Sequence, residues 1–205
     1  MPTLLQCLTD YQTLSKYLEE RLLKADQPPP APQYAQNANP SAVLAPIVSV
    51  HGAPHLLFTK RSSQLHEHRG EISFPGGHFD EKDPNLLFTA LREAEEEIAL
   101  RQSSAQVLGL LNPVFTVVTN YLIYPFVAAI TPSFSLSDLT LNQSEVESVF
   151  TVPIQQFADP SILRIETRER MGMKLNIHFY HVGQDVIWGA TGRMVADLME
   201  LLPKE

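Results

Sequence analysis

Cysteine is nearly absent from this sequence, since Cys7 is the only one in 205 residues. One cysteine excludes an internal disulfide, and a lone thiol more often packs as a small apolar group than acts as a nucleophile. Long apolar runs are also missing, because no stretch approaches the ~20 residues that a membrane-spanning helix needs. The first residues, MPTLLQCLTD, lack the basic and apolar segments of a secretory signal. We therefore expect a cytoplasmic protein with no membrane partner.

Basic residues are fewer than acidic ones, 15 Lys and Arg against 23 Asp and Glu, which gives a formal net charge of -8. This charge argues against a general nucleic-acid binder, because such proteins present a broad basic surface to the phosphates. A small anionic ligand is still compatible with it if a local basic patch or a bound cation offsets the repulsion. Several of the basic residues lie between Lys60 and Arg69.

The amino-terminal part of the chain predicts a helix followed by a linker. Residues 9–25 carry apolar side chains at helical spacing, with Thr9 and Gln12 in the register of a capping box. From about Gln27 to Ser41 the clustered prolines remove backbone donors and predict a linker or an extended strap. We therefore divide the chain into a segment 1–41 and one main domain, 42–205, large enough to bury a core.

The main domain alternates strands and helices. Residues 42–52 and 55–61 predict a hairpin, and residues 190–202 predict a closing helix. Further strands are predicted at residues 106–118, 121–130, 146–153, 163–170 and 175–182. Helices flanking a mixed sheet predict an α/β layered sandwich.

A helix over about residues 84–99 is the most informative segment. Asp83 is expected to cap it, and Pro84 suits its first turn. Leucine, alanine and isoleucine form one stripe, while Glu93, Glu96 and Glu97 lie roughly 130 to 140° away around the helix. Before it come Gly76 and Gly77, and adjacent glycines permit a close approach of main chain to a ligand.

Three like charges on one helix face repel each other unless something positive compensates. A hard divalent cation such as Mg²⁺ or Mn²⁺ would do so, because it favours carboxylate oxygens and keeps sites open for substrate phosphates. The alternative is a solvated acidic face that Arg92 partly neutralises. The helix alone leaves these two interpretations open.

The segment around this helix resembles the Nudix box, whose usual form is G-x5-E-x7-R-E-U-x-E-E-x-G-U, where U is a bulky aliphatic residue. Here a double glycine, five residues, Asp83, eight residues and REAEEEIAL follow one another. Three positions depart from the usual form: Asp83 replaces the first glutamate, one residue is added before Arg92, and Ala99 replaces the late glycine. The resemblance implies a Nudix-type α/β/α sandwich with an added amino-terminal helix, and metal-dependent cleavage of a nucleoside-diphosphate derivative.

An upstream segment, Leu56 to Gly77, resembles an additional signature of the coenzyme A pyrophosphatase branch, with a threonine, an arginine-serine pair and G-x3-FPGG. The segments EVESVFTVP and IWGATGRMV look like two more parts of that branch. At one position of the signature that is typically basic, this sequence has His66. The resemblance implies that CoA or a CoA ester is cleaved to 4′-phosphopantetheine and adenosine 3′,5′-bisphosphate.

The resemblance also implies roles for individual residues. Glu93 and Glu97 would be the principal ligands of Mg²⁺ or Mn²⁺, with Glu96 as a third carboxylate. Arg92 would orient Glu96 or the start of the helix, and a carbonyl of Gly76 or Gly77 would complete the metal shell. The residues expected to contact substrate are Lys60, Arg61, Arg69, Gly76 and Gly77, with His66 and His68 as weaker candidates. The general base stays open between a glutamate of the box and a later one, Glu145 or Glu147.

Several alternatives stay open. The substrate of such an enzyme is a small molecule, and ADP-ribose, NADH, a nucleotide sugar or a dinucleoside polyphosphate would fit the box as well as CoA. A Nudix-like sensor that binds a nucleotide without cleaving it is a second class. Tyr121, Tyr124 and Phe126 are candidates for the pocket wall, although at least one of them is expected to be buried filler because alternate strand residues face the core. Trp188 is expected to be core packing. The amino-terminal helix is expected either to cap the domain or to contact a second subunit, which leaves a homodimer open.

Overall fold

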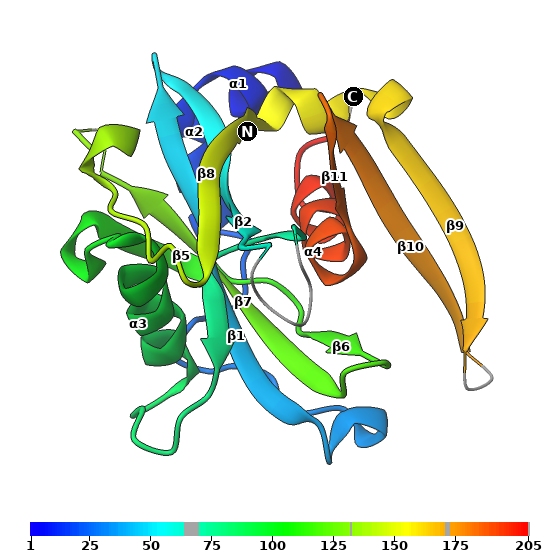
Figure 1. Cartoon of the computed structure of the whole chain (residues 1–205). Helices are drawn as coiled ribbons and strands as arrows, with labels where there is room; N and C mark the ends of the chain where they lie inside the picture. The colour runs from blue at the N-terminus through cyan, green and yellow to red at the C-terminus, as the bar shows by residue number, and fades with distance from the viewer. Residues whose placement is uncertain (64–69, 132, 171–172, 205) are drawn as a thin grey trace.

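The computed structural model describes residues 1–63, 70–131, 133–170 and 173–204. Arg69, His66 and His68, three of the residues proposed to contact phosphate, lie outside this described part. A mixed sheet of eight strands runs through the middle of the molecule (Figure 1), with the helix α3 on one side and the helices α1, α2 and α4 on the other. The predicted α/β sandwich with a mixed sheet is therefore confirmed.

The central strands are β1 (Asn39–Val50) and β7 (Tyr121–Ile130), which pair in parallel over nine residue pairs from Asn39 opposite Tyr121 to Ile47 opposite Ala129. On the other side, β1 forms the predicted hairpin with β2 (Ala53–Arg61), whose turn places His51 and Gly52 at positive φ. The short strand β4 (Gly76–His78) also pairs with β1. The glycine turn is thus fixed to the middle of the sheet.

The remaining strands extend the sheet at both ends. These are β3 (Ile72–Ser73) and β8 (Val146–Pro153), which pair with β2, and β5 (Ala105–Leu110) and β6 (Val114–Thr116), which pair with β7. The prediction of one strand over residues 106–118 was wrong, because the segment divides before Pro113, which has no N–H to donate to a ladder. Short 3₁₀ turns connect the elements: η1 (Gln33–Ala35), η2 (Gln102–Ser104), η3 (Leu136–Asp138), η4 (Ile154–Ala158) and η5 (Pro160–Ile162).

The amino-terminal segment forms two helices, α1 (Leu4–Thr9) and α2 (Tyr11–Glu19), rather than the single predicted helix over residues 9–25. Asp10 interrupts them with an extended backbone, and its carboxylate accepts from the Thr13 N–H at 2.7 Å, so it caps α2. The capping box is therefore not at Thr9 and Gln12. Instead, it is formed by Thr3 and Gln6 at the start of α1.

Both amino-terminal helices are part of the core. Cys7 and Leu18 are fully buried and Leu14 nearly so, in the cluster that also contains residues of α4. The Tyr11 hydroxyl donates to the backbone oxygen of Ile130, at the far end of β7. Burial raises the pKa of the Cys7 thiol, which packs as a small apolar side chain, as expected. The sheet itself begins at Asn39, and the division of the chain at residue 41 stays a prediction.

The carboxyl-terminal part consists of α4 (Gly189–Glu200) and a second sheet of three antiparallel strands. Its order is β11 (Asp185–Trp188), β10 (Met173–Val182) and β9 (Leu163–Arg170). The helix α4 packs against β10, while β9 is the outermost strand (Figure 1). Trp188 is 42% exposed and stacks on Phe179, so the prediction that it is core packing was wrong.

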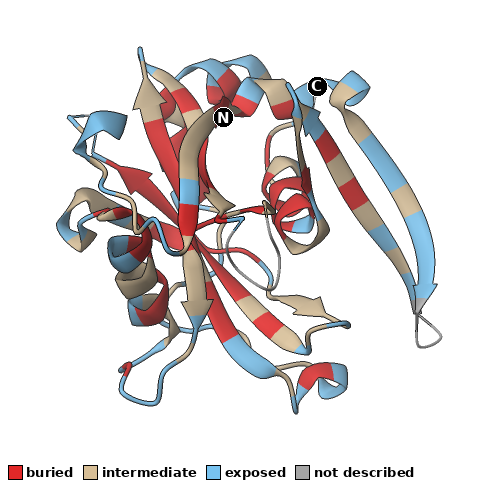
Figure 2. Ribbon diagram, in the orientation of Figure 1, coloured by how far each residue is buried: buried red, intermediate tan, exposed pale blue. Residues whose placement is uncertain are grey.

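Two apolar layers enclose the central sheet, as Figure 2 shows by the buried residues on its strands. Alternate side chains of β1 enter different layers: Ala45 and Ile47 enter the layer that contains α1, α2 and α4, whereas Leu44 and Val48 enter the layer that contains α3. This alternation fixes the face of the sheet that each neighbouring strand presents. In the described part of the chain, no helix is long and apolar enough to cross a membrane.

Candidate active site

The helix α3 spans Leu86–Ile98 and begins two residues later than predicted. Its N-cap is Asn85, whose side-chain oxygen accepts from the Phe88 N–H at 2.9 Å, so the assignment of Asp83 as the cap was wrong. Asp83 is buried and turns towards the helix side chains instead, where it accepts from the Thr89 hydroxyl at 2.8 Å. The helix ends at Ala99, which has a φ of 56° in the left-handed region.

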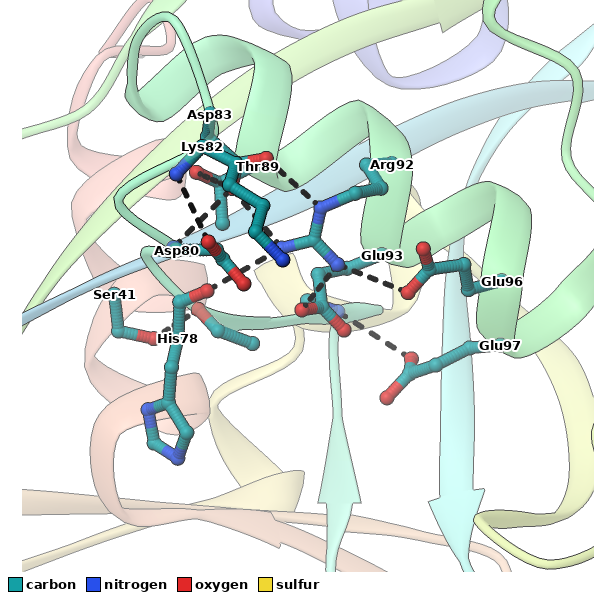
Figure 3. Close-up of polar contacts among 12 residues, drawn as sticks. Ser41, His78, Asp80, Lys82, Asp83, Thr89, Arg92, Glu93, Glu96 and Glu97 are labelled. Carbon is teal, nitrogen blue, oxygen red and sulfur yellow. Dashed lines mark hydrogen bonds and ion pairs between the residues drawn. The ribbon is translucent and has the colours of Figure 1, made fainter.

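Arg92 is the centre of a network of charges on this helix (Figure 3). Its guanidinium donates to both carboxylate oxygens of Asp83, each at 3.0 Å. It also pairs with Glu93 and Glu96, each at 2.9 Å, and its second terminal nitrogen donates to the backbone oxygen of His78 at 3.4 Å. The bonds from Arg92 and Thr89 hold the pKa of Asp83 at about 2. One cation thus ties the helix to the strand β4.

Glu97 is the buried carboxylate of the site, with 4% of its surface exposed. The N–H of Gly76 donates to its Oε2 at 3.3 Å, and the backbone oxygen of Glu97 accepts from the Asn142 N–H at 2.9 Å. Burial raises the pKa of Glu97 to about 8, against the opposing effect of the Arg61 guanidinium. The helix therefore does not present all three glutamates to solvent, because β4 and the segment before β8 cover this one.

Glu93 and Glu96 have different surroundings. Burial is also the main cause that raises the pKa of Glu93, although its ion pair with Arg92 acts in the opposite direction. The charges of Glu93 and Glu145 both raise the pKa of Glu97, which places three carboxylates within electrostatic reach of each other. Glu96 has 58% of its side chain exposed and pairs with Arg92, and its charge also raises the pKa of Glu93.

The glycine turn packs directly on Glu93. A Cβ added to Gly77 would lie 2.5 Å from the carboxyl carbon of Glu93 and 2.6 and 2.7 Å from its oxygens. A Cβ on Gly76 would meet the backbone oxygen of Ala42. The Gly77 carbonyl accepts from the Ser41 hydroxyl at 2.6 Å. Two glycines are needed here because the backbone must pass between a strand and a carboxylate.

Together these residues suit a hard divalent cation. Burial and neighbouring negative charge make ionised Glu93 and Glu97 unfavourable, and a cation would relieve both effects. Among the described residues, no three His, Cys, Asp or Glu side chains form one ligand group. Mg²⁺ and Mn²⁺ are typically bound by one or two carboxylates together with water and phosphate oxygens.

The predicted phosphate contacts separate on two faces of the sheet. The charge of Arg61 acts on Glu97, and its Nε is buried with no hydrogen-bond partner among the described residues. Lys60 forms an ion pair with Asp185 of β11 at 3.0 Å, on the other side of β2. Glu147 is exposed and acts on Lys60, whereas Glu145 acts on the carboxylates of α3. The structure thus brings Arg61 and Glu145 to the site, but not Lys60 or Glu147.

Only one of the three aromatic candidates for a pocket wall has a suitable position. Phe126 is fully buried, and Tyr124 is 6% exposed with its hydroxyl donating to the backbone oxygen of Pro29. These two side chains therefore pack in the core, and the expectation that at least one of the three is buried filler is confirmed. Tyr121 is half-buried and stacks on His78, with ring centroids 4.6 Å apart.

Some residues of the site were not predicted. Asn142 fixes Glu145 by donating to its Oε1 at 2.9 Å, and Ser41 holds the Gly77 carbonyl. Neither residue has a motif around it. The sheet pairing of β1 with β4 and the packing of residues 140–145 on the end of α3 bring them to the site.

The fold and the site together define a class of protein. It is an α/β/α sandwich in which an acidic helix faces a glycine turn. Residues 38–170 match the NUDIX domain family. The protein named "Uncharacterized Nudix hydrolase NudL" of Photorhabdus laumondii is 37% identical over 173 residues, which cover 84% of this chain and 90% of that protein. The protein of the same name from Yersinia enterocolitica is 32% identical over 189 residues, which cover 92% of this chain and 93% of that protein. The chain belongs to the Nudix family and is a Nudix hydrolase.

A solved structure supports the fold. The MutT/nudix family protein from Enterococcus faecalis superimposes with a TM-score of 0.52 over 92% of this chain and 67% of its own. Its sequence identity of 13% makes this a likeness of fold alone. Nudix hydrolases generally require divalent cations such as Mg²⁺ or Mn²⁺.

Proposed function

We propose that this Nudix hydrolase cleaves the diphosphate of coenzyme A or of a CoA ester, and releases 4′-phosphopantetheine and adenosine 3′,5′-bisphosphate. The observation that carries the proposal is the electrostatic effect of Arg61 on Glu97, whose pKa the guanidinium charge lowers against the larger effect of burial. Arg61 belongs to the upstream segment that resembles the CoA-pyrophosphatase signature, and Glu97 belongs to the box. This electrostatic interaction supports one site built from both motifs.

Different residues of the chain would bind the metal ion and the substrate phosphate. Glu93 and Glu97 would hold Mg²⁺ or Mn²⁺, and Arg92 would keep Glu93 and Glu96 in place through its ion pairs. The bound cation supplies neutralisation of the diphosphate and acidification of a water molecule. Arg61 would donate to a phosphate oxygen, because its Nε has no partner among the described residues and a guanidinium fits phosphate geometry well.

Glu145 is the proposed general base. Asn142 occupies its Oε1, so Oε2 would take the proton from the attacking water. Its charge acts on both Glu93 and Glu97, which supports a position at the reacting centre. Glu147 is exposed and associated with Lys60, so we do not assign it this role.

The remaining basic candidates have weaker support. Lys60 would have to leave its ion pair with Asp185 to reach a phosphate. Arg69 stays a proposed contact, outside the described residues. Gly76 and Gly77 would admit the substrate phosphates close to the main chain, because any side chain there meets β1 or Glu93.

The direct test is product analysis. The protein would be incubated with CoA, ADP-ribose, NADH and a dinucleoside polyphosphate in Mg²⁺ or Mn²⁺, and the products identified by mass spectrometry. We expect the highest kcat/KM for CoA, with one 4′-phosphopantetheine for each adenosine 3′,5′-bisphosphate. A clear preference for another diphosphate would overturn the CoA assignment, and tight nucleotide binding without any cleavage would instead indicate a sensor.

A further inference from the structure

The strand β9, Leu163–Arg170, is the free edge of the three-stranded sheet. It pairs with β10 through eight consecutive residue pairs without a register shift. In the part of the chain that the structure describes, no strand pairs with its other side. Figure 1 shows this edge at the margin of the molecule, away from α3. A regular edge strand presents unpaired N–H and C=O groups, which is a template for another strand.

The sequence of β9 restricts such pairing through charge alone, because five of its eight residues are charged and oppose any partner strand of the wrong pattern. The strand has neither proline nor a bulge, two of the devices that usually protect an edge. Ile165, near its beginning, is 52% exposed, although its neighbours on the same sheet are polar or buried. An exposed isoleucine in a regular edge strand gains most from a partner that covers it.

The charges on β9 favour pairing with a second copy of the same strand. Side chains of Arg164, Glu166 and Arg168 alternate with Ile165 and Thr167, so they lie on the other face of the strand. If a second copy pairs antiparallel about Ile165, each Arg164 lies opposite Glu166 of the partner subunit, and the two isoleucines meet at the twofold axis. Symmetry repeats this attractive pair on both sides.

Other symmetric registers are less favourable. A centre at Glu166 places two glutamates opposite each other and Arg164 opposite Arg168 of the partner subunit. A centre at Arg164 opposes two arginines. A centre at Thr167 places Glu166 opposite Arg168 of the partner subunit, but it also places Arg164 opposite Arg170 of the partner subunit and Ile165 opposite Glu169 of the partner subunit. Like charges directly opposite each other destabilise a strand pair, so the register about Ile165 is the one that the sequence favours.

Arg164 is held in place for this contact. Its guanidinium lies 4.9 Å from the centre of the Phe179 ring, which stacks on Trp188. It also pairs with Glu166 of its own strand at 2.8 Å, as Arg168 does from the other side. A row of alternating charges is therefore ordered before any partner arrives, which lowers the entropy lost on association.

We propose that two copies of this chain form a dimer by antiparallel pairing of their β9 strands about Ile165, which joins two three-stranded sheets into one continuous sheet. The proposal does not depend on the substrate or on the activity, because β9 contributes no residue to the site on α3.

Analytical ultracentrifugation of the full chain is the first test. The wild type is expected to sediment as a dimer, and Arg164→Glu as a monomer, because it places two acidic side chains opposite each other. Arg168→Glu is the matched control, since Arg168 is as exposed as Arg164, 59% against 60%, and contacts the same Glu166 at the same 2.8 Å. It is expected to stay dimeric. The double variant Arg164→Glu with Glu166→Arg exchanges the two charges and is expected to restore the dimer.

A cross-link tests the register itself. Ile165→Cys is expected to give a disulfide-linked dimer under mild oxidation, because the two side chains are direct neighbours across the axis. Thr167→Cys is expected to cross-link much less, and Cys7 does not interfere because it is fully buried. Circular dichroism would show that each variant is folded. A monomeric wild type at high protein concentration overturns the proposal, and so does a dimer that Arg164→Glu leaves intact or that Arg168→Glu also dissociates.

Discussion

A Cβ on Gly77 would lie 2.5 Å from the carboxyl carbon of Glu93, so the strand β4 and the helix α3 meet at a point with no room for a side chain. The position of this carboxylate therefore depends on a glycine of β4, outside the helix that carries Glu93. Gly77 has no positive φ, so the requirement comes from space and not from backbone strain.

The first prediction follows from this contact. Gly77→Ala is expected to displace Glu93 and lower kcat/KM for the diphosphate substrate about a hundredfold, while circular dichroism shows an intact fold. Gly52→Ala is the control, because Gly52 has no atom within 4 Å of an added Cβ. That variant is expected to lose some stability from its φ of 86° but to keep its activity. Equal activity losses in the two variants would remove the role assigned to Gly77.

A second prediction concerns Asp83 and Arg92. Asp83→Asn is expected to lower the free energy of unfolding by about 2 kcal/mol at neutral pH, because it leaves a guanidinium without its ionic partner. The folded pKa of Asp83, about 2, lies below its unfolded value. Its contribution is therefore fully present above the unfolded pKa and is lost as the pH falls through about 2.

Urea denaturation of both proteins checks this. The difference in unfolding free energy is expected to be the same at about pH 7 and about pH 5 and to shrink only in stronger acid. Asp80→Asn is the control, because Asp80 is exposed and caps only a local turn through the Lys82 N–H. A difference that already shrinks between the two higher pH values would contradict the assignment.

The third prediction uses the end of α3. Ala99 adopts a left-handed conformation, with a φ of 56°, at the position where the usual Nudix box has glycine. Ala99→Gly is expected to raise the free energy of unfolding by about 1 kcal/mol. Thermal or urea unfolding measures it. A destabilised glycine variant would show that the methyl group of Ala99 contributes more through packing than it costs in strain.

The fourth prediction separates two neighbouring basic residues. Arg61→Gln is expected to raise KM for the substrate about tenfold, because a charge-assisted contact to phosphate is lost. Lys60→Gln is expected to leave KM unchanged and to cost little stability, since it removes only a partly exposed ion pair with Asp185. Steady-state kinetics of both variants decide the matter. The reverse result would assign phosphate recognition to Lys60.

The sequence predicted the features that local periodicity and motifs encode. The hairpin of residues 42–61, the acidic helix and the terminal helix follow from apolar spacing and turn residues. The grouping of Glu93 and Glu97 with the glycine turn followed from the box alone. Both residues come from one continuous segment, so little tertiary information was needed.

Other features depend on contacts between distant segments. Asp83 is a residue type that often caps helices, yet its carboxylate accepts from the guanidinium of Arg92, and Asn85 caps the helix instead. Glu97 was expected on an open face, but β4 and the segment around Asn142 bury it. Trp188 was assigned to the core by its residue type, and only the register of β10 with β11 places it on the outer face. No local pattern contains these pairings.

The central claim is that the carboxylates of α3 form the catalytic centre, and Glu97→Gln tests it most directly. Turnover of CoA with Mg²⁺ or Mn²⁺ would be measured for the wild type, for Glu97→Gln and for Glu95→Gln, whose side chain is exposed on the same helix and only accepts from Gln102. We predict that Glu97→Gln stays folded and loses kcat by orders of magnitude, while Glu95→Gln keeps it. Full turnover in a folded Glu97→Gln protein would contradict the account.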